Sequence, residues 1–128
     1  PPPGRRIGTD ARGMIWMGPD QYLAETAPGG TDLAGELGKA FGTTASITDQ
    51  SDAWVRFDIT GDDVPAMLER LSAADTRRMR ADAAVRTPVH HMLCVLVCRD
   101  AGTSFTIYGP RASARSLHHA LTAAAASI

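Results

Sequence analysis

Residues 49–52, Asp-Gln-Ser-Asp, bring two carboxylates and a hydroxyl together within four positions, directly ahead of Trp54. A serine acts as a nucleophile only when a neutral histidine lies within hydrogen-bond reach and accepts its proton. The sequence contains four candidate bases: His90, His91, His118 and His119. Nothing in the sequence places any of them beside Ser51. Because Asp and Ser also form turns by bonding to their own backbone, we interpret the stretch as a turn that opens a strand.

The two cysteines, Cys94 and Cys98, lie in an apolar run that is typical of a strand. Along a strand their α-carbons are roughly 13 Å apart, which is too far for a disulfide. With His90 they would form a collinear row that cannot converge on one metal ion. Gly35 and Gly38 fall inside an expected helix, so the sequence offers no phosphate-binding glycine loop. We therefore predict no catalytic, cofactor-binding or metal-binding residue in this chain.

Composition excludes several classes of partner. The 128 residues carry 13 basic and 14 acidic side chains, so no basic surface for nucleic acid is expected. The longest apolar run, residues 92–98, is far shorter than the ~20 residues of a membrane-spanning helix. Without a basic and apolar leader pattern, a cytoplasmic location is expected. Residues 1–13 predict a poorly ordered lead-in, and residues 14–128 a single domain.

The N-terminal half predicts a hairpin, a helix and two strands. Gly18-Pro19-Asp20 is a turn sequence between two short extended pieces. After Gly29-Gly30, Thr31 or Asp32 caps a helix that ends at Gly42. A short β-prone segment follows at 43–48, and then a strand from Trp54. In that strand Val55, Phe57 and Ile59 form the core face, and Trp54, Arg56 and Asp58 lie on the opposite face.

The second half predicts a helix whose apolar stripe is Val64, Met67, Leu68 and Leu71. Residues 72–87 are expected to be an irregular connection. Residues 89–99 then form a strand covered on both sides, followed by a hairpin into 104–108 and a helix from 112. The order is ββ-α-β-β-α-β-β-α. We therefore expect an α+β fold, an antiparallel sheet with helices packed on one face.

Three aromatic residues have no evident ligand to bind: Trp16 and Tyr22 flank the first turn, and Trp54 lies opposite the core face of its strand. Helices on one face alone would leave the other sheet face bare. A bare apolar sheet face usually marks a permanent protein interface. We therefore predict that Trp16, Tyr22 and Trp54 contribute to an interface.

Four stretches, taken in order and spacing, resemble the gamma subunit of heterotetrameric sarcosine oxidase over about Met14–Ala125. They are MIWMGPDQYL, DQSDAWVRFDITGDDVPAMLERLSAAD, AVRTPVHHMLCVLVCR and FTIYGPRASARSLHHAL. More distantly, the chain is similar to the first domain of the glycine cleavage T-protein, an aminomethyltransferase. That family carries a Gly-Gly pair and a pterin-binding acid on the strand after the second helix. Residues 89–98 have neither, so a T-protein-like fold without folate chemistry is implied.

The resemblance implies a non-catalytic subunit of a complex that oxidatively demethylates sarcosine to glycine. That complex produces hydrogen peroxide and passes the one-carbon unit to tetrahydrofolate. The partners expected are the larger alpha and beta subunits and the small delta subunit, which would hold FAD, FMN, NAD, zinc and tetrahydrofolate. Two alternatives remain open. The chain could serve a complex acting on another N-methyl amine, or it could be a free-standing folate or small-molecule binding module.

Overall fold

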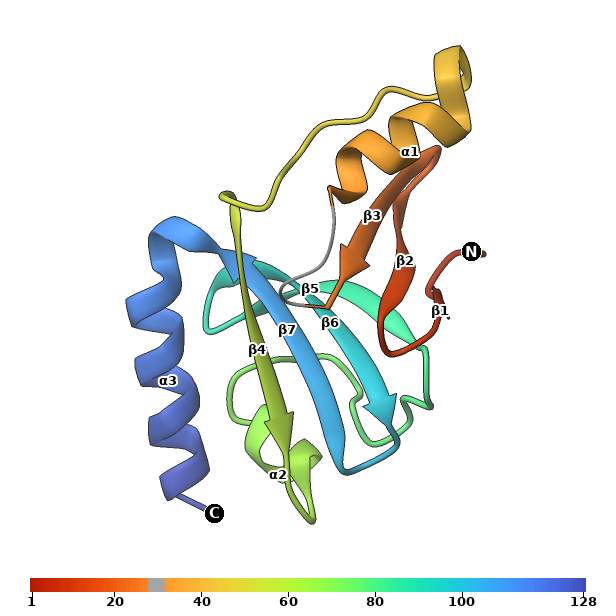
Figure 1. The fold of residues 1–128 in the computed structure, drawn as a ribbon. Coiled ribbons are helices and arrows are strands. Elements are labelled where there is room, and N and C mark those ends of the chain that lie inside the picture. The colour runs from red at the N-terminus through yellow and green to blue at the C-terminus, as the bar shows by residue number, and fades with distance from the viewer. Residues whose placement is uncertain (28–31) are drawn as a thin grey trace.

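Two antiparallel sheets face each other in the computed structural model of the chain, which describes residues 1–27 and 32–128 (Figure 1). The smaller sheet has the order β1-β2-β3, with bounds Arg6–Gly8, Arg12–Gly18 and Gln21–Thr26. The larger sheet has the order β4-β7-β6-β5, with bounds Trp54–Thr60, Ser104–Pro110, Met92–Asp100 and Ala84–Val89. A bridge between Arg5 and Ala83 links the two sheets next to β1.

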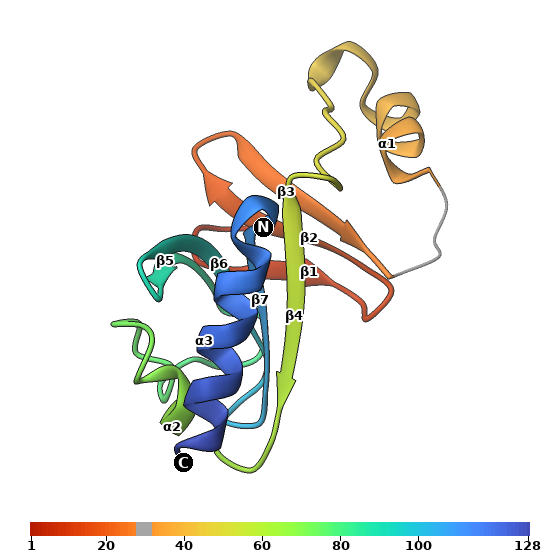
Figure 2. The same cartoon turned by 90° about the vertical axis from the view of Figure 1, so that its left-hand side faces the viewer.

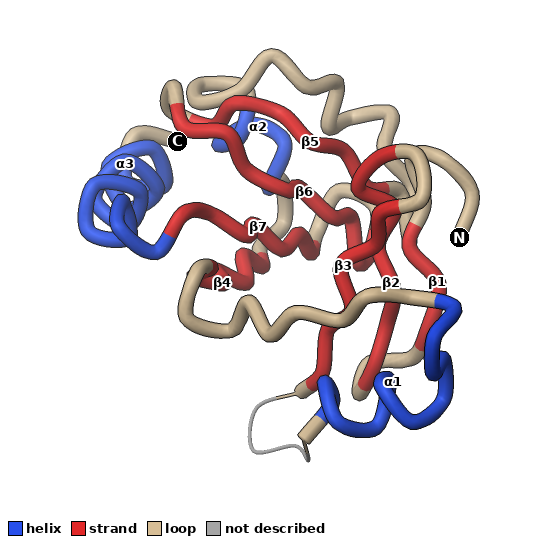
Figure 3. The backbone as a smooth tube through the Cα atoms, turned by 90° about the horizontal axis from the view of Figure 1, so that it is seen from above, coloured by secondary structure: helices blue, strands red, loops and turns tan. Residues whose placement is uncertain are grey.

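Three helices complete the described part of the chain: α1 (Leu33–Phe41), α2 (Val64–Leu68) and α3 (Ala114–Ala126). Short 3₁₀ turns follow α1 at Gly42–Thr44 and precede α3 at Arg111–Ser113. Figure 2 shows α2 and α3 on the face of the larger sheet that is turned away from the smaller one. Viewed from above in Figure 3, α1 lies beside the smaller sheet. Among the described residues, no helix is long and apolar enough to cross a membrane.

The alternation of side chains along the central strand β6 explains why the fold has two cores. Cys94, Leu96 and Cys98 point toward α2 and α3 and pack with residues such as Leu117. Val95 and Val97 point the other way, toward the smaller sheet. Successive residues of a strand face opposite sides, so an unbroken apolar run is stable only when both faces are covered. The expectation of a strand covered on both sides is therefore confirmed.

The α+β class and the helices on one face of a sheet are confirmed, but a second sheet covers the other face. Ile15 and Leu23 of the smaller sheet pack against Val95 and Val97. The expectation of a bare face on the larger sheet was therefore wrong. The sequence did not reveal this, because alternation identifies an inward face without identifying what covers it.

The N-terminal segment 1–13 also differs from the expected poorly ordered lead-in. Within it β1 pairs with β2, with Arg6 opposite Ile15, and the Arg6 backbone N–H donates to the Asp82 carbonyl at 2.8 Å. The Arg6 side chain is only 5% exposed. The sequence favoured disorder because this Pro- and Gly-rich terminal segment shows no periodicity, whereas in the structure Arg6 pairs with the buried carboxylate of Glu25.

The element order is also different from that expected. Segment 43–48 forms no strand, and residues 84–89, expected to be irregular, form the edge strand β5. The strand expected at 89–99 is interrupted, because His90 and His91 are the two turn residues between β5 and β6. The polar, arginine-containing composition of residues 72–87 favoured an irregular connection, yet the edge strand β5 can carry exposed polar side chains, and it also tolerates Pro88. Of the two residues expected to cap α1, Asp32 is the cap; Thr31 lies outside the described residues, as does the preceding pair Gly29 and Gly30.

Candidate functional site

The face of the smaller sheet that points away from the larger sheet carries an apolar patch. We call this patch the outer face, and it consists of Ile7, Met14, Trp16, Tyr22 and Ala24. Strand register places Trp16 opposite Tyr22, and Met14 between Ile7 and Ala24. These residues alternate with the inward-facing Ile15 and Leu23. Ile7 is 54% and Tyr22 49% exposed, which is high for large apolar side chains on one face. An exposed apolar group of this kind fits a protein interface.

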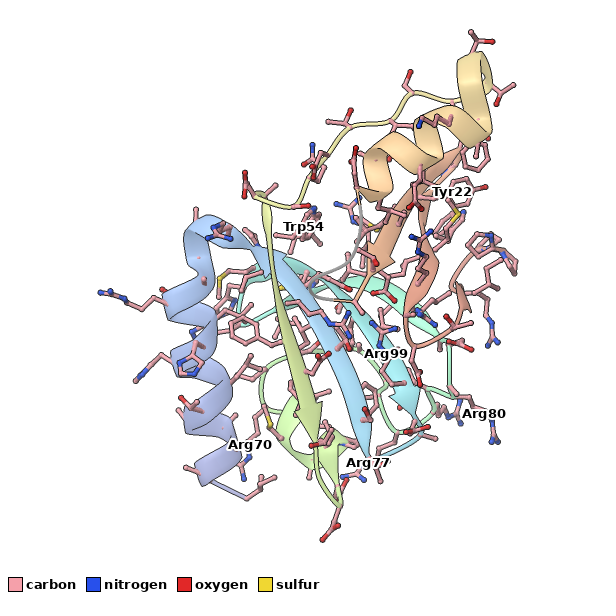
Figure 4. All side chains as sticks on the ribbon, in the orientation of Figure 1. Tyr22, Trp54, Arg70, Arg77, Arg80 and Arg99 are labelled. Atoms are coloured by element: carbon pink, nitrogen blue, oxygen red, sulfur yellow. The ribbon has the colours of Figure 1, made fainter. Side chains whose placement is uncertain are left out.

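Trp54 does not belong to this outer face. It begins β4 in the larger sheet, where it is half-buried and packs against the apolar cluster between the two sheets. Figure 4 shows Tyr22 beside α1 and Trp54 at the start of β4, on separate elements. Of the three aromatic residues expected at an interface, Trp16 and Tyr22 therefore lie together, and Trp54 lies apart from them.

The Asp49–Asp52 stretch forms the turn that the sequence predicts. The Asp49 carboxylate accepts hydrogen bonds from the Ser51 backbone N–H at 2.9 Å and from the Ser51 hydroxyl at 2.7 Å. The backbone hydrogen bond and then the hydroxyl lower the pKa of Asp49. All four residues are exposed. The Ser51 hydroxyl donates to an exposed carboxylate whose lowered pKa makes it a weak base, and no hydrogen bond joins Ser51 to a histidine among the described residues.

None of the four histidines lies beside Ser51. His90 and His91 form the β5–β6 turn, with their ring centres 5.7 Å apart. His118 lies against Phe57 at 6.1 Å, and its neighbour His119 lines a groove beside α3. Among the described residues, no group of three or more His, Cys, Asp or Glu side chains is placed to hold a metal ion.

The most prominent polar feature is a buried carboxylate between the sheets. Glu25 of β3 accepts from Arg6 Nε at 2.5 Å and from Arg99 at 2.8 and 2.9 Å. The Tyr108 hydroxyl also donates to Glu25, and Arg56 lies 3.7 Å away. We call these five residues the Glu25 cluster. Glu25 is only 8% exposed, so its charge depends on these donors rather than on water.

Burial and hydrogen bonding act in opposite directions on the pKa of Glu25. Burial raises it, but hydrogen bonds from Arg99, Tyr108 and Arg6 together outweigh burial and lower the pKa to about 2. For Tyr108, burial and the bond to Glu25 act together and raise the pKa to about 12. At neutral pH, Glu25 is therefore an anion and Tyr108 a neutral donor.

A second layer of partners balances the charge of the Glu25 cluster. Asp58 accepts from Arg56 at 3.0 Å and from Thr106 at 2.6 Å, and Asp82 accepts from Arg6 at 3.2 Å. Three carboxylates thus oppose the three guanidinium groups of Arg6, Arg56 and Arg99. Donors from both sheets hold the Glu25 carboxylate. The Glu25 cluster therefore joins the two sheets and leaves no group directed at a substrate.

Sequence reasoning missed the Glu25 cluster because its members are far apart in the chain. Glu25 is separated from Arg6 by 19 positions, from Arg99 by 74 and from Tyr108 by 83. One local signal was available in Gly13, which lies opposite Glu25 in β2. A Cβ at that position would lie 2.5 Å from the Arg6 guanidinium, so only glycine leaves room for the side chain of Arg6.

A solved structure shares this architecture. The match is a chain of the heterotetrameric sarcosine oxidase from Corynebacterium sp. U-96, determined in complex with pyrrole 2-carboxylate, with a TM-score of 0.84 and 22% identity. The fold is that of a sarcosine oxidase chain. The alignment covers 97% of this chain and 65% of the matched chain. No family model and no curated protein matches the sequence.

The match confirms the resemblance read from the sequence at the level of the fold. At 22% identity, a shared fold does not by itself carry the activity of one protein to another. The chain also spans only 65% of the length of the sarcosine oxidase chain that it matches. A subunit role is consistent with the match, whereas the choice of subunit and the reaction have to be argued separately.

Proposed function

We propose that this chain is a non-catalytic, gamma-type subunit of a heterotetrameric sarcosine oxidase or a near relative. The observation that carries the proposal is the agreement in fold over 97% of the chain with a chain of such a complex. The complex would oxidise sarcosine to glycine, reduce oxygen to hydrogen peroxide and transfer the one-carbon unit to tetrahydrofolate. FAD, FMN, NAD, zinc and tetrahydrofolate would be bound by the alpha, beta and delta partners.

The disposition of polar groups supports a non-catalytic role. The buried carboxylate of Glu25 and its guanidinium partners neutralise one another, and the Ser51 hydroxyl is bonded to Asp49. Catalytic groups in general keep a donor or acceptor directed at the substrate. The described residues offer no group of side chains that suits zinc. We therefore assign the chemistry to the partner subunits.

The outer face is the surface through which we propose that the chain joins its partners. Large exposed apolar residues are enriched in permanent interfaces, where aromatic side chains supply much of the buried area. Trp16 and Tyr22 form a cross-strand pair on a rigid sheet, so they need little reordering when a partner covers them. The larger flavoprotein subunits are the proposed occupants.

Affinity purification of the tagged chain from cells that express the candidate partner subunits tests the proposal. We expect larger flavin-containing subunits to co-purify and the complex to produce peroxide from sarcosine, while the chain alone is colourless. A panel of other N-methyl amines separates sarcosine oxidase from a related complex. Failure to recover any partner, together with saturable binding of tetrahydrofolate to the lone chain, would support the free-standing binder instead.

A further inference from the structure

A surface groove lies between the end of α2, the β5–β6 turn and α3. It consists of two adjoining hollows of about 490 and 410 Å³. Both are lined by Arg70, Leu71 and His90, which therefore lie where the hollows meet. His91 lines only the first hollow, and His119 only the second. The groove is far from the outer face in the fold, since it borders the helices of the larger sheet.

The turn that supplies His90 and His91 has an unusual sequence for its geometry. Both residues have a positive φ, 49° and 69°, as the two central residues of a type I′ hairpin turn require. Asn, Asp and Gly usually occupy these positions because most side chains are strained at positive φ; histidine adopts it more readily than most residues but less readily than glycine. The His90 N–H is bonded to the Leu71 carbonyl at 2.8 Å, which holds the turn against the end of α2. Two successive histidines held at positive φ beside a groove motivate the hypothesis that their side chains bind a ligand there.

Arg70 supplies a positive charge with no counter-ion among the described residues. Its guanidinium makes one described hydrogen bond, to the Ser127 carbonyl at 3.4 Å, and no described carboxylate lies within ion-pair distance of it. The neighbouring Glu69 also lines the groove, but Arg77 holds its carboxylate at 2.5 Å. Figure 4 shows Arg70 between α2 and the C-terminal part of α3. The guanidinium can therefore bind a carboxylate without displacing a described carboxylate partner.

Apart from His119, the α3 wall of the second hollow is apolar. Ala120, Ala123 and Ala124 line it together with Leu71. We propose that the groove binds a small organic carboxylate, whose anionic end contacts Arg70 and the imidazoles of His90 and His119 and whose apolar body lies on the alanines of α3. This site does not depend on the proposed subunit role. A free phosphate would use the same cation but would gain nothing from the apolar wall.

Titration of the full chain with benzoate, followed by the imidazole C–H signals of the four histidines in NMR, tests the proposal. We expect saturable shifts of the His90 and His119 signals and little change at His118, which lies on Phe57. Benzyl alcohol, which keeps the ring without the charge, should give no saturable shift. Inorganic phosphate should bind more weakly than benzoate. Tighter binding of phosphate, or equal binding of benzyl alcohol, would overturn the proposal.

Two variants identify the residues responsible. Arg70→Gln should weaken benzoate binding about ten-fold or more, whereas Arg80→Gln, an exposed arginine on the opposite side of the molecule in Figure 4, should leave it unchanged. The double variant His90→Asn with His91→Gly should raise Tm, because the turn strain is relieved, and still weaken binding. Unchanged affinity in both the Arg70 variant and the double variant would show that the groove is not the site.

Discussion

Glu25 of β3 and Arg99 of β6 form a two-point ion pair, with guanidinium nitrogens 2.8 and 2.9 Å from the two carboxylate oxygens. The two strands belong to different sheets, so this pair fixes one sheet against the other. A planar guanidinium matches a carboxylate in only a few orientations. The pair therefore specifies how the sheets are aligned, which apolar contacts between Ile15 and Val97 could do only loosely.

Replacement of Glu25 by Gln should destabilise the chain by about 3–5 kcal/mol, the range for breaking a buried ion pair by removal of one partner. The loss arises because Arg6 and Arg99 remain buried without their anion. Urea unfolding of the wild type and the variant measures it. Asp75→Asn, which removes an exposed pair with Arg78 at 3.6 Å, is the matched control and should change stability little. A similar effect of both variants would contradict a role for burial.

Acid should remove the advantage of the wild type over Glu25→Gln. The pKa of Glu25 is lowered from an ordinary 4.5 to about 2 in the folded chain, so the unfolded chain binds the proton first. The contribution of this carboxylate is complete above about pH 5 and is lost as pH falls toward 2. The urea midpoints of the two proteins should move closer together as pH falls from 7 to 3, although the remainder of the difference is lost only nearer pH 2. A constant difference over this range would show that the carboxylate is not stabilised as an anion.

Phe57 and Phe105 lie in the core between the larger sheet and helices α2 and α3, and truncation of each should destabilise the chain to a different extent. Phe105 is fully buried, whereas Phe57 is half-buried and packs at the margin of the same cluster. Phe105→Ala should cost about 3–5 kcal/mol, and Phe57→Ala less, because less apolar surface returns to water and a smaller cavity forms. Chemical unfolding of both variants decides the order. The reverse order would mean that Phe57 makes contacts beyond those in this chain's core.

The local elements could be predicted from the sequence wherever one pattern determined them. Residues close together in the sequence determine three such features: the Asp32 cap, the Val64–Leu68 helix and the alternation after Trp54. The β5–β6 turn was missed because His-His is a poor sequence for a turn with two positive φ values. It is kept in place by a hydrogen bond to Leu71, which a local reading of the turn does not reveal.

The tertiary polar contacts could not be predicted in this way. Glu25 sits in a strand whose residues look half-exposed, and its buried state depends on guanidinium groups from β1 and β6. Likewise, Trp54 was correctly placed opposite the core face of its strand. Its surroundings were not foreseen, because the covering sheet comes from residues 6–26. Pairing between distant segments is set by the whole fold, and a single sequence carries little information about it.

The outer face should control assembly rather than folding. Tyr22 is 49% exposed and faces away from the core, so Tyr22→Asp should leave the unfolding midpoint nearly unchanged. In the complex, the new charge would be buried among apolar groups without a partner, which should reduce recovery of the complex at least ten-fold. Trp54→Asp should show the opposite pattern, because Trp54 packs between the sheets: lower stability of the chain itself, with assembly affected only through that loss.

Co-expression of each tagged variant with the partner subunits, followed by affinity purification and a thermal melt of the chain alone, separates these two effects. Ile128→Asp is the matched control, since Ile128 is 61% exposed at the C-terminus and lies outside the outer face. It should alter neither recovery nor Tm. Because each measurement reports on one property, Tyr22→Asp should lower recovery at constant Tm. Normal recovery of the complex with Tyr22→Asp would place the interface elsewhere, and the outer edges of β3 and β4, which pair with no further strand among the described residues, would then be the next surfaces to test.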